Sequence, residues 1–200
     1  MIFSWLLFLL NFQTTEGLKC KAQKPQNEHG IKPIHIIDQE TDFEEGHLKA
    51  LVPRLSTEWI VDFQFVLNGP HTSTHNYCNI FRIGKGDNWT NYGDRLVALF
   101  FHKAVLNNNL SIFTAINGAD RNIHGDTIIY DVEYKVKVQQ KYHGNNIYKI
   151  HVHINDQEVS VVENAIQHVR QFYDLKVYVG DPWYPACNGK ISNVKIINFL

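Results

Sequence analysis

Two turn-rich segments of the sequence combine aromatic rings with polar side chains, and this combination can bind a sugar. Segment 84–94 contains Trp89 and Tyr92, and segment 180–189 contains Trp183 and Tyr184. The apolar face of a sugar ring stacks on Trp or Tyr, while Asp and Asn accept hydrogen bonds from its hydroxyl groups. The ligand-binding residues that we predict from this pattern are Trp89, Tyr92, Asp94, Asp181, Trp183 and Tyr184.

The two tryptophans have different expected environments. Pro182 and Pro185 flank Trp183 and stiffen its segment, which lowers the entropic cost of ordering that segment on binding. Trp183 can instead pack against the body of the protein, and we favour this role because large aromatic side chains dominate buried cores. Trp89 lies among polar residues, and we expect it to be exposed.

Calcium is the cofactor that the sequence favours. This ion takes several oxygen ligands from carboxylates, amides and backbone carbonyls. We expect segments 84–94 and 117–126 to be loops, and both are rich in such oxygens, although Asp, Asn and Gly also simply form turns. The calcium hypothesis involves Asp87, Asp94, Asp120 and Asp126.

Catalytic chemistry has weaker support in the sequence. Hydrolysis of a glycosidic bond uses two carboxyl groups about 5–10 Å apart, and Asp131 and Glu133 have a compatible spacing on a strand. They lie beside Lys135 and Lys137, however, on what reads as a solvated face. We therefore expect a protein that is not an enzyme, with a glycan-acting hydrolase as the weaker alternative.

Histidines offer a second incomplete motif. His151 and His153 are two apart, so on a strand they project from the same face and could share a zinc ion. A closed zinc site needs two further ligands, and no spacing identifies them. Surface histidines that titrate near neutral pH are the simpler interpretation.

The start of the chain predicts secretion. The apolar stretch Ile2–Leu10 is shorter than the roughly 20 residues that span a bilayer, and it is followed by the small and polar residues of a cleavage site. We predict a signal peptide over residues 1–17, although a buried N-terminal strand or helix is the alternative. No later segment is long and apolar enough to span a membrane. Removing residues 1–17 takes away Glu16 and changes the formal net charge from −1 to 0, which leaves no basic footprint for nucleic acid.

Three cysteines remain after such a cleavage, which is an odd number for an oxidising compartment. We expect Cys187 to pair with either Cys78 or Cys20, and the sequence does not choose between them. The third cysteine could then link this chain to a second copy or to another protein.

Two sequons for N-linked glycosylation are present, at Asn88 and Asn109. Both predict exposed positions in a secreted protein. Trp89 in the middle of the first sequon makes Asn88 the poorer acceptor.

Alternating hydrophobicity is the main structural signal, and period two is typical of half-buried strands. Four separate runs show it: Trp59–Phe65, Val132–Val138, Tyr148–Ile154 and Leu175–Val179. Two further runs, 96–101 and 110–116, look buried on both faces. Residues 163–170 could form one short helical turn.

Counting these runs gives ten or eleven strands without an internal repeat. Short strands separated by turns favour two face-packed antiparallel sheets. We therefore expect an all-β protein in which residues 18–30 are a flexible lead-in and residues 31–200 form one domain.

Several blocks of the chain resemble the concanavalin A-like (laminin-G-like) jelly-roll domains of animal extracellular proteins. The most specific are Val177–Ala186 (Val-Tyr-Val-Gly-Asp-Pro-Trp-Tyr-Pro-Ala) and 189–196 (Gly-Lys-Ile-Ser-Asn-Val-Lys-Ile), and similarity to Asn91–Phe101 and Lys149–Val159 extends the match over about residues 45–199. The resemblance implies a two-sheet jelly roll, with calcium often bound at a rim and ligands held by loops or a sheet face. The Glu-x-Asp-x-Glu motif of the glucanase branch and the legume-lectin metal pattern are both absent from the sequence.

These observations lead to one main functional expectation. The chain should be a secreted module that binds a glycan or an extracellular matrix protein through rim loops. A structural or interaction protein of an extracellular assembly, joined through the third cysteine, is the alternative.

Overall fold

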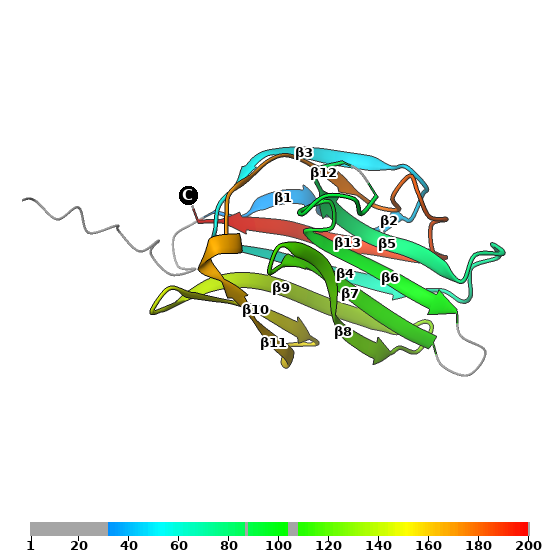
Figure 1. Ribbon diagram of the computed structural model, residues 1–200. Coiled ribbons are helices and arrows are strands. Elements are labelled where there is room, and N and C mark those ends of the chain that lie inside the picture. Colours follow the sequence, from blue (N-terminus) through cyan, green and yellow to red (C-terminus); the bar gives the residue numbers. More distant parts are fainter. Residues whose placement is uncertain (1–31, 87, 104–107, 200) are drawn as a thin grey trace, which may run out of the picture.

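Two antiparallel β-sheets pack face to face, as the sequence predicts (Figure 1). The computed structural model describes residues 32–86, 88–103 and 108–199. Sheet A contains β1 (Ile34–Ile37), β2 (Thr41–Asp42), β4 (Trp59–Leu67), β9 (Glu133–Gly144), β10 (Ile147–Ile154), β11 (Gln157–Ala165) and β13 (Gly189–Asn198). Sheet B contains β3 (Leu48–Leu55), β5 (Tyr77–Gly84), β6 (Val97–Lys103), β7 (Asn108–Ile116), β8 (Ala119–Thr127) and β12 (Phe172–Tyr178).

The strand order shows that sequence neighbours and spatial neighbours differ. Sheet A runs β1-β13-β4-β9-β10-β11 with β2 beside β13, and sheet B runs β3-β12-β5-β6-β7-β8. The first and last strands therefore lie side by side, with Ile34 opposite Ile196. This arrangement places β12 next to β5, which brings the segments that follow these two strands together.

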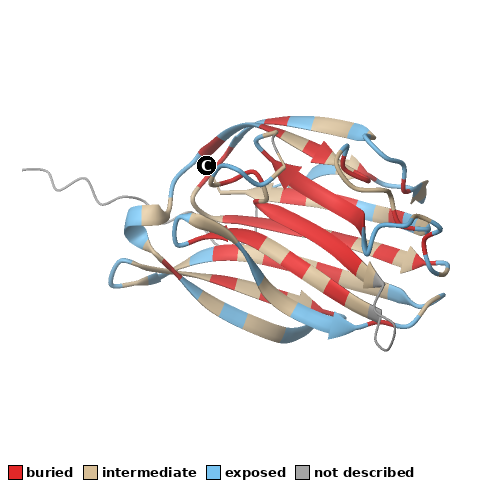
Figure 2. Ribbon diagram, turned by 45° about the vertical axis from the view of Figure 1, so that its right-hand side comes forward, coloured by how far each residue is buried: buried red, intermediate tan, exposed pale blue. Residues whose placement is uncertain are grey.

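The core is the layer between the sheets, and the period-two runs supply it (Figure 2). Alternate residues of β4 and β12, such as Phe63 and Val177, are fully buried. The rings of Phe63 in sheet A and Phe81 in sheet B lie 4.6 Å apart between their centroids. Burial of apolar area of this kind stabilises a fold by roughly 25 cal/mol per Å².

Three sequence expectations change in the structure. Segment 117–126 is not a loop: Asn117 and Gly118 have positive φ angles and form a tight turn, after which β8 begins at Ala119. Strand β7 is not buried on both faces, because Ser111 and Phe113 are only half-buried. Strand β9 begins at Glu133, so Val132 precedes it and is exposed.

Other expectations are met. Residues 166–168 form a single 3-10 turn within the segment for which a helical turn was expected. The buried cysteines Cys78 and Cys187 form a disulfide, which settles the choice of partner for Cys187. Cys20, the expected signal peptide and the lead-in lie outside the described residues. Within the described part of the chain, no helix has the length and hydrophobicity to cross a membrane.

Candidate functional site

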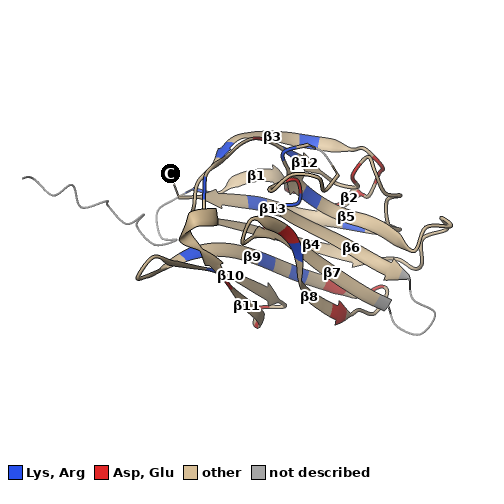
Figure 3. Cartoon of the chain, in the orientation of Figure 1, with Lys and Arg blue, Asp and Glu red and all other residues tan. Residues whose placement is uncertain are grey.

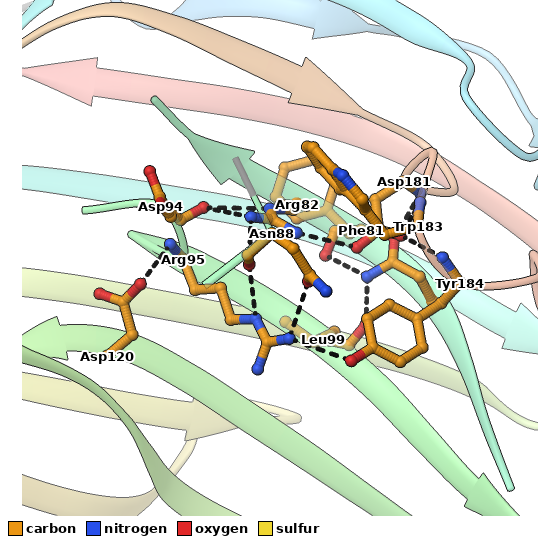
Figure 4. A network of polar contacts seen from close by, with 11 residues as sticks. Phe81, Arg82, Asn88, Asp94, Arg95, Leu99, Asp120, Asp181, Trp183 and Tyr184 are labelled. Carbon is orange, nitrogen blue, oxygen red and sulfur yellow. Dashed lines mark hydrogen bonds and ion pairs between the residues drawn. The ribbon is translucent and has the colours of Figure 1, made fainter. Parts of the chain in front are cut away.

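Two loops cover one end of the outer face of sheet B. Val97, Leu99 and Phe101 of β6 point into the core, so Ala98 and Phe100 point to the opposite face. Ala98 lies opposite Arg82 of β5, yet both side chains are buried. The loops that bury them are 85–96 and 179–188, which are the two segments singled out from the sequence, slightly extended (Figure 4).

Arg82 ties the two loops together. Its Nη1 forms an ion pair with Oδ2 of Asp181 at 3.1 Å, and both side chains are almost completely buried. Its Nε and Nη2 donate to the backbone oxygen of Asp94 at 3.0 and 2.8 Å. The guanidinium lies 4.3 Å from the ring centroid of Trp183. Trp183 therefore packs under its loop, in the role favoured from the sequence.

Asp181 organises its own loop. Its Oδ1 accepts hydrogen bonds from the backbone N–H groups of Trp183 (3.1 Å) and Tyr184 (2.9 Å). Burial raises the pKa of Asp181, while the charge of Arg82 opposes that shift. Burial likewise lowers the pKa of Arg82, and Asp181 opposes it. With its oxygens used in this way, Asp181 presents no group to solvent, although the sequence predicted it as a ligand contact.

Asp94 within loop 85–96 and Asp120 on β8 organise that loop in the same way, by accepting backbone N–H groups. Asp94 accepts the backbone N–H of Asn91 at 2.8 Å and is buried. Asp120 accepts the backbone N–H groups of Gly93 (3.1 Å) and Arg95 (2.8 Å). Burial raises the pKa of Asp120 and the two N–H donors oppose it. Asp94 therefore closes a turn within the loop, and Asp120 holds the loop onto the start of β8.

The aspartates of the calcium hypothesis do not converge. Asp126 lies at the other end of β8 from Asp120, about 20 Å away at the usual rise of about 3.3 Å per residue. Its Oδ1 accepts the backbone N–H of Thr127. Asp87 lies outside the described residues, and among those that are described no three His, Cys, Asp or Glu side chains are grouped to hold a metal. The described members of this set therefore do not fit a calcium site.

A pocket opens beside the buried Arg82 cluster, on the outer face of β5, β6 and β7. Its volume is about 210 Å³, and it is lined by Tyr77, Arg95, Phe100, Phe113 and Tyr184. The Phe100 ring makes edge-to-face contacts with Phe113 (5.6 Å between centroids) and Tyr184 (5.1 Å). Such contacts add about 0.5–1.5 kcal/mol each to area burial and fix the aromatic wall.

Arg95 is the charged residue of this pocket. Its Nε donates to the backbone oxygen of Asn88 at 3.1 Å, and its Nη2 donates to Oδ1 of Asn88 at 3.0 Å and to Oη of Tyr184 at 3.4 Å. The guanidinium lies 4.9 Å from the Phe100 ring centroid and 5.2 Å from that of Phe113. Arg95 thus connects the two loops (Figure 4) and also packs against the rings of Phe100 and Phe113.

The remaining predicted aromatic residues separate into two groups. Trp89 is 65% exposed, as expected, and Tyr184 lines the pocket. Tyr92 is half-buried instead: its Oη donates to the backbone oxygen of His168 at 3.1 Å, and Arg170 covers its ring at 4.5 Å. Of the predicted aromatic residues, Trp89 is therefore the exposed one and Tyr184 the one that lines the pocket, while Tyr92 and Trp183 are half-buried.

Four pocket residues did not emerge from the sequence: Tyr77, Arg95, Phe100 and Phe113. Phe100 and Phe113 belong to runs that were interpreted as buried on both faces. The available signal was the alternation within these runs, because Phe100 is out of phase with the core residues Leu99 and Phe101. Only the pairing of β6 with β7, which places Phe113 opposite Ala98, shows that the Phe113 ring reaches the Phe100 ring on the same face.

The other candidate residues lie away from the pocket. Asp131 and Glu133 are exposed and accept hydrogen bonds from the side-chain amides of Asn68 (3.2 Å) and Gln64 (3.3 Å). Of the two sequons, Asn88 contributes its Oδ1 to Arg95, and Asn109 lies in β7. His151 and His153 lie on the outer face of sheet A, because Ile150, Val152 and Ile154 of the same strand point into the core.

Comparison with known proteins agrees with this architecture. No protein-family model matches the sequence, and no curated protein matches it. The receptor-binding domain of botulinum neurotoxin D is similar in structure, with a TM-score of 0.54, 13% identity, and coverage of 85% of this chain and 43% of the other. The chain has the concanavalin A-like jelly-roll fold.

Two further jelly-roll structures give lower scores. A SAP-like pentraxin from Limulus polyphemus has a TM-score of 0.47 and 14% identity over 86% of this chain and 73% of the pentraxin chain. The alginate lyase Aly36B has a TM-score of 0.47 and 12% identity over 80% of this chain and 78% of the lyase chain. At these identities the likeness concerns the jelly-roll fold alone.

Proposed function

We propose that this jelly-roll protein is a secreted binding module that holds a glycan in the aromatic pocket of sheet B. The observation that carries the proposal is the lining of that pocket, which combines four aromatic rings with a guanidinium. Ligand sites typically combine apolar and aromatic walls with a few well-placed polar groups. The Tyr77 and Tyr184 hydroxyls and Arg95 supply those polar groups here.

Binding rather than catalysis is favoured by the chemistry of the pocket. Among the described residues that line it, none is a carboxylate, an imidazole or a thiol, so the carboxyl pair of a glycoside hydrolase is missing from the lining and its two tyrosine hydroxyls are the remaining groups that could transfer a proton. The fold itself does not decide, because its structural neighbours include both a pentraxin and an alginate lyase.

Secretion is part of the same proposal. Buried disulfides such as Cys78–Cys187 form and persist mainly in oxidising compartments. The apolar stretch Ile2–Leu10 with its following small and polar residues has the pattern of a signal peptide. Both observations support an extracellular location.

A glycan array probed with the full chain tests the proposal. We expect binding to a restricted set of glycans, a loss of about tenfold in affinity for Tyr77→Ala, and little change on adding EDTA. Tyr173→Ala is the matched control, because Tyr173 is a similarly exposed tyrosine on β12 of the same sheet. Equal effects of the two variants, or no binding to any glycan, would contradict the pocket assignment.

Trp89→Ala is a second variant for the array. Trp89 is exposed in the loop whose Asn88 contacts Arg95, so it lies in the loop that borders the pocket. We expect weaker glycan binding with an unchanged melting temperature. Unchanged binding would remove Trp89 from the site while leaving the pocket itself in place.

A second candidate function is a component of an extracellular assembly. It is favoured by the cysteine count: Cys78 and Cys187 pair with each other, so the third cysteine, Cys20, can form a disulfide with another chain. Electrophoresis of the secreted protein without reductant should then show a disulfide-linked species that Cys20→Ser abolishes. A monomer under both conditions would reject this candidate.

A further inference from the structure

Arg95 has hydrogen-bonding capacity that the protein does not use. A guanidinium carries five N–H donors. The contacts to Asn88 and Tyr184 use the donors on Nε and Nη2. Within the described part of the chain, Nη1 has no partner, so its two N–H groups remain for a ligand.

The charge of Arg95 is also unbalanced at close range. By contrast, Arg82 of β5 is paired with the carboxylate of Asp181. No described carboxylate forms such an ion pair with Arg95, and the nearby Asp120 uses both of its oxygens on backbone N–H groups. The Phe100 and Phe113 rings shield the guanidinium from water and compensate its charge only weakly.

Such a guanidinium selects for an anion. Partial shielding from water strengthens its attraction for an opposite charge, and arginine binds carboxylates and sulfate-like groups through pairs of parallel N–H bonds. The pocket volume of about 210 Å³ lies below the roughly 300–1,000 Å³ of sites for drug-sized ligands. It therefore suits one sugar ring better than an extended segment of polysaccharide.

We infer that the aromatic pocket recognises a single acidic sugar ring, whose carboxylate or sulfate pairs with Nη1 of Arg95. This inference rests on the proposed function and specifies its ligand class. The rings of Phe113 and Tyr184 contact the apolar face of the sugar, the buried Phe100 ring supports them from below, and Tyr77 lines the pocket beside them. A neutral sugar leaves the Arg95 charge without a partner.

Isothermal titration of the full chain with two matched ligand pairs tests the inference. One pair is galacturonic acid and its methyl ester, which differ in charge at the carboxyl group. The other pair is galactose 6-sulfate and galactose. We expect the charged member of at least one pair to bind about tenfold more tightly than its neutral partner, and the pair that shows the difference identifies the anionic group. Raising the salt concentration should reduce that difference by screening.

Variants of Arg95 link the preference to the pocket. Arg95→Gln should abolish the difference between charged and neutral ligands, while Arg95→Lys should retain part of it because the charge remains. Arg54→Gln is the matched control, since it removes an exposed arginine from β3 at the edge of the same sheet. Circular dichroism and a melting curve show whether each variant is folded, and Arg95→Lys keeps the test valid if Arg95→Gln is not.

The outcomes separate the inference from the function on which it rests. If the neutral and charged members of both pairs bind equally well, the acidic-sugar inference is wrong and glycan binding stands. If the preference persists in Arg95→Gln and in Arg95→Lys at full strength, the anion binds elsewhere and the inference is wrong. If none of the four sugars binds and the glycan array is also blank, both proposals fail.

Discussion

At the scale of single residues, the site contrasts two arginines that differ in their surroundings. Arg82 is buried, and its charge is balanced by Asp181, so it connects the two loops. Arg95 is half-buried at the pocket and has donors to spare. The same side chain is structural in one place and available for binding in the other because only one of them faces a carboxylate.

Removing the Asp181 carboxylate should be costly. Asp181→Ala leaves the buried Arg82 charge without this counter-ion, and breaking a buried ion pair typically costs about 3–5 kcal/mol. Urea denaturation measures the change in the free energy of unfolding. Glu40→Ala, which breaks the exposed ion pair with Lys190, should cost less than about 1 kcal/mol. Similar costs for the two variants would show that the Arg82–Asp181 pair does not fasten the loops.

At the scale of elements, the hairpin of β9 and β10 gives sheet A an outer face quite unlike that of sheet B. Lysines lie along β9 (Figure 3); His143 is on the same strand, and His151 and His153 are on the neighbouring β10. The Nε2 atoms of His143 and His151 are 2.8 Å apart, so one ring donates to the other. Nδ1 of His151 lies 2.7 Å from Glu158 on β11. This chain of contacts joins three strands and requires that His143 and His151 are not both fully protonated.

Acid should therefore weaken the fold through these histidines. Burial, with His151, Lys149 and Lys141, lowers the pKa of His143, and burial with Lys137 lowers that of His153, while Glu158 opposes both shifts. The folded state then binds protons less readily than the unfolded chain, whose histidines titrate near 6.5. The neutral histidines therefore contribute to the free energy of unfolding in full above about pH 6.5. That contribution is lost as the pH falls through their lowered folded-state pKa values.

Thermal melts from pH 7.5 to 5 measure this effect. We expect the melting temperature to fall with pH, and to fall less in His143→Gln/His153→Gln than in the unchanged protein. His35→Gln serves as the control, because the His35 side chain is exposed on β1 and its ring hydrogen-bonds to Asp38, away from the β9–β10 histidines. Asp62 has a pKa raised by burial and acts in the opposite direction, so the comparison between variants is decisive. Identical pH profiles would rule out the histidine cluster as the cause.

At the scale of the whole molecule, the disulfide joins the site to the core. Cys78 lies in β5 and Cys187 just before β13, 109 residues apart in sequence. Backbone hydrogen bonds between Asn79 and residues 185 and 187 run beside the disulfide. The loop that carries Tyr184 is therefore anchored at its end next to the strand that carries Arg82.

Loss of the disulfide should affect both stability and binding. Cys78→Ala/Cys187→Ala should lower the free energy of unfolding by about 2–5 kcal/mol, the usual range for native disulfides. It should also weaken glycan binding, because Tyr184 loses its anchor. Guanidinium denaturation and the glycan array measure the two effects. Cys20→Ser should change neither, and an equal loss in that variant would point to a role for Cys20 in folding.

The sequence by itself determined many of the strands and the two-sheet architecture, because alternation along runs such as Trp59–Phe65 and Leu175–Val179 depends only on residues close in the chain. The polar neighbours of Trp89 also indicated that it would be exposed, and the aromatic residues between prolines singled out segment 180–189. It could not show that Asp94 and Asp181 would be buried, since their partners are backbone N–H groups whose positions depend on the folded loops.

Only the tertiary structure decided where the pocket lies. Arg95, Phe100 and Phe113 come together with Tyr184 because β12 pairs with β5, β5 with β6, and β6 with β7. Those pairings follow from which side chains fill the layer between the sheets, a property of residues far apart in the sequence. Local periodicity carries no information about such partners, so the fold was accessible from the sequence while most of the pocket was not.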